Sequence, residues 1–328
     1  MHRLKIISGH LSHRRELWRS DCGSGSAGSS RSEDVVVVHG RRTAVGKAKR
    51  GCFKDTTPDE LLSTVMTAVL TDVGLSPNKL GDVCVGNVLQ PGAGAVMSRV
   101  AHFLSGFPDT VPVYAVNRQC SSGLQALFNV AGSIRSGSID LGLACGITSE
   151  NVAERFGVSR EKQDAFALSS QLKAARAQSS GLFDQEIVPV TTRVVDDAGN
   201  ERQVTVSKDE GIRPGTTLEG LAKLKPAFKP DGSTTAGLTV ADIDVFEINE
   251  AFASQAVYCV EKLGIPLEKV NPSGGAIALG HPLGCTGARQ VVTLLNELKR
   301  RGRRGFGVVS MCIGTGMGAA AVFEYPGL

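Results

Sequence analysis

Two cysteines and one histidine lie in short glycine-rich segments whose residue types suit nucleophilic chemistry. Cys120 lies where an expected strand gives way to a helix, His281 lies in a glycine-rich loop, and Cys312 follows a later strand. A thiol that attacks a carbonyl carbon, an imidazole that takes its proton and a second thiol that supplies one would act as nucleophile, base and acid. Together they predict acyl transfer by a thiol. The segments are Asn117-Arg118-Gln119-Cys120-Ser121-Ser122-Gly123, Gly280-His281-Pro282 and Cys312-Ile313-Gly314-Thr315-Gly316.

The backbone around these residues adds to the chemistry. N–H groups in the first turn of a helix stabilise a thiolate, so we expect the pKa of Cys120 to be lowered. The same N–H groups, and that of Gly314, could hold an oxyanion on an attacked carbonyl. The alternative for Cys120 is a buried, inert cysteine, which is the usual state of an intracellular cysteine.

A polar pair, Asn249-Glu250, comes directly after an expected strand at 243–248. Buried polar side chains need hydrogen-bond partners. These two could cap the next helix, or they could fix a water beside His281. A zinc site made of Cys120, His281 and Cys312 is the metal alternative, but it lacks a fourth protein ligand and its spacing matches no common zinc module. We therefore expect no metal.

Strands alternate with helices along most of the chain, which indicates an α/β fold with strands buried on both faces. A capping box at Thr57 and Glu60, with Pro58 in the first turn, predicts the start of a helix that runs to Leu70. Further helices are expected at 121–134 and 159–177. Strands are expected at 35–38, 83–85, 113–116, 141–145, 243–248 and 306–311, with a hairpin formed by 187–192 and 203–206.

The chain also repeats itself. Gly74, Gly123 and Cys145 match Gly237, Gly287 and Cys312, at offsets of 163, 164 and 167 residues, and the two central glycines are taken as helix starts. A nearly constant offset predicts two similar halves that arose by duplication. The division that we expect is a targeting segment and linker at 1–33, an N-terminal half at 34–146, a loop region at 147–236 and a C-terminal half at 237–328.

Composition and charge exclude several classes of protein. Of the 328 residues 41% are hydrophobic and 21% charged, which is typical of a globular chain. No apolar run is long enough to span a membrane. The eight cysteines form no CxxC pair, so a disulfide framework is not expected. Residues 1–50 hold eleven Lys/Arg and four Asp/Glu, so the basic charge belongs to the N-terminal segment and not to a nucleic-acid-binding face.

The first residues carry a targeting pattern. Arg3-Leu4, five residues and His10-Leu11 resemble the N-terminal peroxisomal targeting signal, a nonapeptide that an import receptor reads. A mitochondrial leader is the alternative, because Arg14, Arg15 and Arg19 follow. The four fixed positions favour the peroxisome.

The motifs together resemble the thiolase family, and within it the peroxisomal members. Asn-Glu-Ala-Phe at 249–252, Gly-His-Pro-Leu-Gly at 280–284 and Cys-x-Gly-x-Gly at 312–316 carry the resemblance. It implies a duplicated, layered αβαβα sandwich with an inserted loop domain, working as a homodimer. It also implies thiolysis of a 3-oxoacyl-CoA by coenzyme A to acetyl-CoA and a shortened acyl-CoA. Coenzyme A is then a substrate, and no separate cofactor is needed.

The resemblance assigns a role to each residue. Cys120 would attack the 3-keto carbon and carry the acyl group, and His281 would activate it and help to hold the thioester oxygen. Cys312 would protonate the leaving enolate and then deprotonate coenzyme A. Asn249 would hold a water in one oxyanion hole, and the N–H groups of Cys120 and Gly314 would form the other. Arg213 would lie near the coenzyme A nucleotide.

The sequence departs from the family at two junctions, after Gly146 and after Gly237, where segments of the family pattern are missing. The missing parts include at least one central strand of each half. A catalytically inactive deletion variant, acting at most as a dimer partner, is therefore the alternative function. A condensing enzyme of fatty-acid synthesis is a second alternative, but such enzymes use two histidines where this chain has His281 and Cys312.

Overall fold

The computed structural model describes residues 34–47, 50–146, 160–196, 198–219, 240–314 and 317–327. The chain divides into two compact units, residues 1–36 and 37–328, and all helices and strands named below lie in the second. The strands form two three-stranded sheets and one hairpin. The predicted targeting segment and linker at 1–33, and the parts 147–159 and 220–236 of the predicted loop region, lie outside the described residues.

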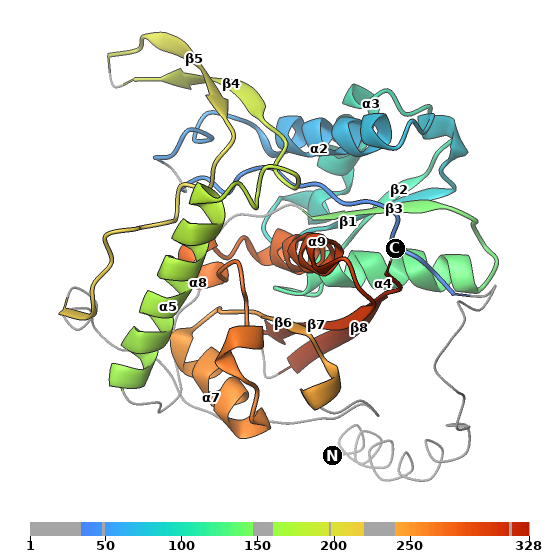
Figure 1. Ribbon diagram of the computed structural model, residues 1–328. Helices are drawn as coiled ribbons and strands as arrows, with labels where there is room; N and C mark the ends of the chain where they lie inside the picture. The colour runs from blue at the N-terminus through green and yellow to red at the C-terminus, as the bar shows by residue number, and fades with distance from the viewer. Residues whose placement is uncertain are drawn as a thin grey trace, which may run out of the picture. The chain divides into compact units, whose positions relative to one another are not determined.

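The first half of this unit is a parallel sheet of order β2-β1-β3 with helices on both faces. Helices α2 and α3 cover one face, and α4 covers the other (Figure 1). The elements are α2 (Pro58–Asp72), β1 (Asp82–Gly86), α3 (Ala95–Leu104), β2 (Val113–Val116), α4 (Ser122–Arg135) and β3 (Gly142–Gly146), with short 3-10 turns at Pro77–Lys79 and Gly92–Gly94.

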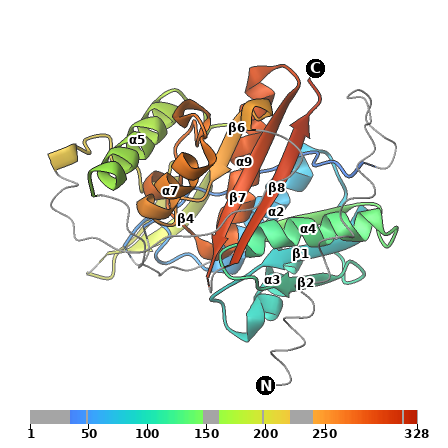
Figure 2. The same ribbon diagram turned by 90° about the horizontal axis from the view of Figure 1, so that it is seen from below.

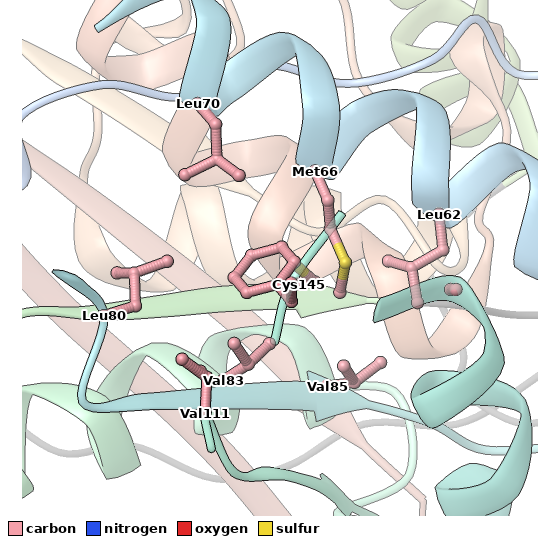
Figure 3. Packing of buried hydrophobic residues seen from close by; sticks show 10 residues of the cluster. Leu62, Met66, Leu70, Leu80, Val83, Val85, Val111 and Cys145 are labelled. Atoms are coloured by element: carbon pink, nitrogen blue, oxygen red, sulfur yellow. The ribbon is translucent and has the colours of Figure 1, made fainter. Parts of the chain in front are cut away.

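Helix α2 begins where the sequence predicts. The backbone N–H of Thr57 donates a hydrogen bond to the carboxylate of Glu60 at 2.8 Å, as in a capping box. Three apolar side chains one turn apart, Leu62, Met66 and Leu70, then point from the helix onto β1 (Figure 3). Burial of this stripe fixes the helix on the sheet.

The second half is also a three-stranded sheet with helices on both faces. Strands β6 and β7 are parallel, and β8 pairs with β7 in the antiparallel sense. Helices α7 and α9 cover opposite faces, as Figure 2 also shows. The elements are β6 (Val245–Ile248), α7 (Ala253–Leu263), α8 (Ala276–Leu279), α9 (Leu283–Arg301), β7 (Gly305–Ile313) and β8 (Met317–Tyr325), with 3-10 turns at Val240–Asp242 and Leu267–Lys269.

Two strands of each sheet correspond. β1 and β6 begin 163 residues apart, as do β3 and β7, and β1 runs parallel to β3 as β6 does to β7. The sheets differ at their edges: within the described residues no strand lies beside β6 as β2 lies beside β1, and none lies beside β3 as β8 lies beside β7. The predicted strand at 35–38 is wrong: Val36 and Val38 are 70% and 74% exposed and no strand forms there. An apolar run becomes a strand only beside a neighbour whose N–H and C=O groups it can pair with.

Helices α4 and α9 lie side by side between the two sheets (Figure 1). They approach so closely that a Cβ on Gly123 would lie 2.8 Å from the carbonyl oxygen of Gly284, and one on Gly287 would lie 2.6 Å from the N of Leu124. Gly287 is therefore a contact inside α9 and not the predicted helix start, because α9 already begins at Leu283. The layers run α2 and α3, first sheet, α4 and α9, second sheet, α7.

Between the halves lie α5 (Arg160–Ser179) and the antiparallel hairpin of β4 (Val190–Val195) and β5 (Glu201–Val206), both close to the predicted bounds. A buried ion cluster connects this region to the start of the unit. The guanidinium of Arg42 donates to Glu186 and to Asp209, each at 2.8 Å.

Among the described residues, no helix combines the length and apolar character that crossing a membrane requires.

Candidate active site

Cys120 lies in a tight turn between β2 and α4. The residue before it, Gln119, has a φ of 47°, in the left-handed region that residues other than glycine rarely adopt. The turn is held by the backbone N–H of Arg118, which donates to the hydroxyl of Ser122 at 3.0 Å. Such strained turns occur often at functional sites, where they present one side chain.

The loop after β7 closes over this turn. A Cβ on Gly314 would collide with the side-chain amide oxygen of Gln119, which would have to move to make room for it. The N–H of Gly314 donates to the Cys120 thiol sulfur, which favours the thiolate and lowers the pKa, as does the N–H of Cys120 itself. Two backbone donors thus converge beside one sulfur, which is the geometry of an oxyanion hole.

The net pKa of Cys120 is nevertheless raised, because burial of the thiol outweighs the two backbone hydrogen bonds. The expectation of a lowered pKa is therefore wrong. It considered only the local helix terminus, whereas burial is produced by residues far away in the sequence. A thiol that stays protonated at neutral pH needs a base to become a nucleophile.

Cys312 lies near the end of β7, beside Cys120. Burial, and then the neighbouring Cys120, raise the pKa of its thiol to about 12. The side-chain amide of Asn249 donates to the Cys312 sulfur at 3.4 Å. Cys312 therefore holds its proton at neutral pH and can give it to a stronger base.

His281 follows the short helix α8 and is linked to the same asparagine. The amide nitrogen of Asn249 lies 3.5 Å from its Nε2, and Nδ1 lies 2.7 Å from the hydroxyl of Thr286. Burial, and then the positive charge of Arg289, lower the pKa of His281 to about 4. The imidazole is thus neutral at pH 7 and can accept a proton.

Asn249 is the residue that joins the two groups. It is completely buried at the end of β6, where its backbone N–H donates to the carbonyl of Ser310 on β7 at 2.8 Å. Its side-chain nitrogen reaches both His281 and Cys312, and its Oδ1 has no hydrogen-bond partner within the described residues.

Glu250 has a different role from the water-holding one that we considered. Its carboxylate accepts hydrogen bonds from Ser170 on α5 and from Asn271, each at 2.6 Å, and from the N–H of Ile277 at 3.1 Å. It thus fixes the chain from 271 to 277 that leads into His281. No local pattern around Glu250 indicates this role, because Ser170 lies 80 residues away.

Arg213 belongs to a segment that packs against α8, the short helix before His281. Its backbone N–H donates to Gln171 of α5 at 2.7 Å, and Gly211 packs against the carbonyl oxygen of Ala278, where a Cβ would come within 2.4 Å. The structure therefore brings the segment of Arg213 next to α8.

The described residues include no group of three His, Cys, Asp or Glu side chains that could hold a metal ion.

The neutral state of His281 has a measurable consequence for stability. The folded chain does not bind a proton at His281 until about pH 4, whereas the unfolded chain binds one near pH 6.5. The folded state thus carries fewer protons in this window, and stability decreases as the pH falls through it, by about 3 kcal/mol in total. We expect His281→Asn to remove this loss.

Urea unfolding of both proteins at pH 7 and pH 4 measures the difference. Other titrating groups, such as Glu247, are common to the two proteins and cancel in the comparison. Equal losses in the wild type and the variant would contradict the lowered pKa.

Two family models match this chain. The thiolase N-terminal domain matches residues 35–148 and 144–241, and the thiolase C-terminal domain matches residues 225–325. The arrangement of two similar halves around a Cys–His–Cys site is thus that of a class of acyltransferases, and the chain belongs to the thiolase family.

Individual relatives agree. The peroxisomal 3-ketoacyl-CoA thiolase B of Mus musculus is 58% identical over 424 aligned positions, covering 100% of both chains, and the peroxisomal 3-ketoacyl-CoA thiolase of Homo sapiens is 57% identical with the same coverage. The dimeric peroxisomal thiolase of Saccharomyces cerevisiae superposes with a TM-score of 0.77 at 38% identity, covering 90% of this chain and 98% of that one. Another structure of that yeast enzyme is described as five-layered, which is the order of layers found here.

The alignments also bear out the missing segments. An alignment of 424 positions contains at least 96 positions without a residue of this chain, since the chain has 328. The N-terminal family model breaks at 144–148, and the two models overlap at 225–241. These places coincide with the two junctions inferred from the sequence.

Proposed function

We propose that this chain is a 3-ketoacyl-CoA thiolase of peroxisomal fatty-acid β-oxidation. The observation that carries the proposal is geometric: Asn249 reaches both His281 and Cys312, and Cys312 lies beside Cys120, on whose sulfur two backbone N–H groups converge. The names of the relatives give the substrate class and the compartment.

In the first half-reaction, His281 takes the proton of Cys120, and the sulfur attacks the 3-keto carbon of the substrate. The N–H groups of Cys120 and Gly314 hold the oxyanion that forms. The bond between the second and third carbons then breaks, and the acyl group stays on the sulfur. The leaving enolate of acetyl-CoA takes its proton from Cys312, and Asn249 with His281 stabilises the enolate oxygen.

In the second half-reaction, the Cys312 thiolate takes the proton of the coenzyme A thiol. The new thiolate attacks the acyl group on Cys120, and the departing sulfur of Cys120 recovers its proton from His281. Every proton is thereby returned, and no cofactor is consumed. Arg213, beside the loop of His281, is proposed to contact the coenzyme A nucleotide, and residues 147–236 are proposed to form the region that binds it.

The assay of this proposal is the conversion of a 3-oxoacyl-CoA and coenzyme A into equal amounts of acetyl-CoA and an acyl-CoA two carbons shorter. The matching 3-hydroxyacyl-CoA is the control, because its third carbon carries a hydroxyl in place of the carbonyl, so that no enolate of acetyl-CoA can leave from it. Folded, soluble protein that forms no product would favour the inactive deletion variant. We also propose that an import receptor recognises Arg3-Leu4 and His10-Leu11 and carries the chain into the peroxisome.

We further infer that the chain forms a homodimer, as the yeast thiolase does. Helix α3 presents a row of exposed apolar side chains next to β2, a strand at the edge of its sheet: Val96, Val100, Phe103 and Leu104. Exposed apolar patches of this kind mark interfaces.

Placing a charge on α3 is expected to weaken the dimer. Leu104→Lys introduces an ammonium that would have to be buried unpaired, so the monomer fraction in sedimentation velocity should rise. Leu172→Lys on α5 is the matched control, because Leu172 is 50% exposed and Leu104 59%. A dimer that tolerates both changes would place the interface elsewhere.

A further inference from the structure

Thr286 is a completely buried residue in the first turns of α9, five residues after His281. Its hydroxyl oxygen lies 2.7 Å from Nδ1 of His281 and 3.0 Å from the carbonyl oxygen of Pro282. Thr286 thus bonds Nδ1 of the imidazole, whereas Asn249 lies at Nε2.

We propose that Thr286 is a positioning residue that holds His281 with its proton on Nδ1 and a free lone pair on Nε2, facing Asn249 and the thiols. The proposal deepens the function proposed above, because it concerns the base of that reaction.

The hydrogen bonds of Thr286 carry the first step of the argument. A threonine hydroxyl has one hydrogen and two lone pairs. The hydrogen is donated to the Pro282 carbonyl, the bond to residue i−4 that threonine forms within helices. Towards His281 the hydroxyl can then only accept, so Nδ1 carries the proton and Nε2 does not.

The hydrogen-bond partner on the other side of the ring is consistent with the tautomer that Thr286 selects. Nε2 lies 3.5 Å from the side-chain nitrogen of Asn249, which also donates to Cys312. A protonated Nε2 would direct one N–H at another, whereas a bare Nε2 meets a donor. This tautomer is also the one that the mechanism needs, since Nε2 must receive the proton of Cys120.

The position of Thr286 follows from the packing of the two central helices. The Pro282 carbonyl accepts the first backbone hydrogen bonds of α9, from the N–H groups of Cys285 and Thr286 at 2.7 and 2.8 Å. α9 is locked onto α4 through Gly123 and Gly287, and α4 begins directly after Cys120. His281 is thus oriented by Thr286 of α9, and α9 packs on α4, the helix that follows Cys120.

The test compares Thr286→Val, which keeps the shape and removes the hydroxyl, with Thr286→Ser, which keeps the hydroxyl. We expect the valine variant to lower kcat about 10- to 100-fold, as loss of a partner that orients a histidine does in metal sites, with KM for the acyl-CoA unchanged. The serine variant should keep most of the activity. Thr293→Val on the same helix is the control, because Thr293 is equally buried but bonds to Glu186.

A second readout does not depend on turnover. In protein labelled with ¹⁵N-histidine, the couplings of the ring protons report the tautomer, and a His281→Asn variant assigns the signal. We expect the Nδ1–H pattern in the wild type, the serine variant and Thr293→Val, and its loss in Thr286→Val.

Two outcomes would overturn the proposal: an unchanged Nδ1–H pattern in Thr286→Val, or a serine variant as impaired as the valine variant, which would assign Thr286 to packing alone. If the wild-type chain forms no product at all, the proposed function fails, and the tautomer measurement still decides the role of Thr286.

Discussion

Replacing Cys120 by serine is expected to abolish acyl-enzyme formation. After brief incubation with acetyl-CoA, the intact mass of the wild type should increase by one acetyl group, and that of Cys120→Ser should not. An alcohol ionises far less readily than a thiol, and His281, with a pKa lowered to about 4, is too weak a base to compensate. From the loss of comparable nucleophiles we expect turnover to fall by about 10⁴- to 10⁶-fold.

The other cysteines supply the controls for this experiment. Cys52→Ser changes a partly exposed thiol whose charged neighbours are Glu210 and Arg202 and should leave the adduct in place. Cys312→Ala keeps the nucleophile and removes the acid, so a slower adduct on Cys120 is expected. An acetyl group that persists in Cys120→Ser and maps to another cysteine would show that the nucleophile has been misassigned.

The largest expected loss of stability comes from the buried pair of Arg289 and Glu247. The two side chains are almost completely buried and meet at 2.9 Å between Nη1 and Oε2. Arg289→Met would leave the carboxylate buried without its partner, which costs about 3–5 kcal/mol in comparable pairs. Chemical unfolding at pH 8 measures this loss.

The deficit should shrink on acidification. Burial, only partly offset by Arg289, raises the pKa of Glu247 to about 7, so the folded chain holds a proton there that the unfolded chain releases above about pH 4.5. Without Arg289 this pKa rises further. The free energy of unfolding of the variant therefore falls more steeply than that of the wild type as the pH rises. The difference in stability between the two proteins is accordingly smaller at pH 5 than at pH 8.

The double variant Arg289→Met/Glu247→Leu removes both charges and should recover most of the stability at pH 8. If the single and double variants are equally unstable, the cost lies in packing and not in the unpaired charge.

The sequence predicted those features that depend on neighbours along the chain. The capping box at Thr57 placed the start of α2, and the turn residues at 196–199 placed the β4–β5 hairpin. The order of the motifs also predicted that Cys120 and Cys312 would meet, with His281 and Asn249 beside them. The catalytic roles themselves stay predictions until the variants are measured.

The features that the sequence analysis missed depend on distant partners. The pKa of Cys120 is set by burial from another half of the chain, and Glu250 is explained by Ser170, which belongs to a separate helix. Val35–Val38 has the composition of a strand, but no described strand pairs with it. Local pattern cannot show whether a pairing partner lies within reach.

The contact between α4 and α9 through Gly123 and Gly287 sets a limit on how this enzyme family can change. Where side chains separate two helices, a larger or smaller residue can shift one against the other and retune a site. Here the backbones of α4 and α9 touch directly, so no side chain can be exchanged to change the distance between the two helices. We therefore expect new substrate preferences to arise in the loops around the two helices, while the spacing of α4 and α9 keeps the two halves in a constant relative position.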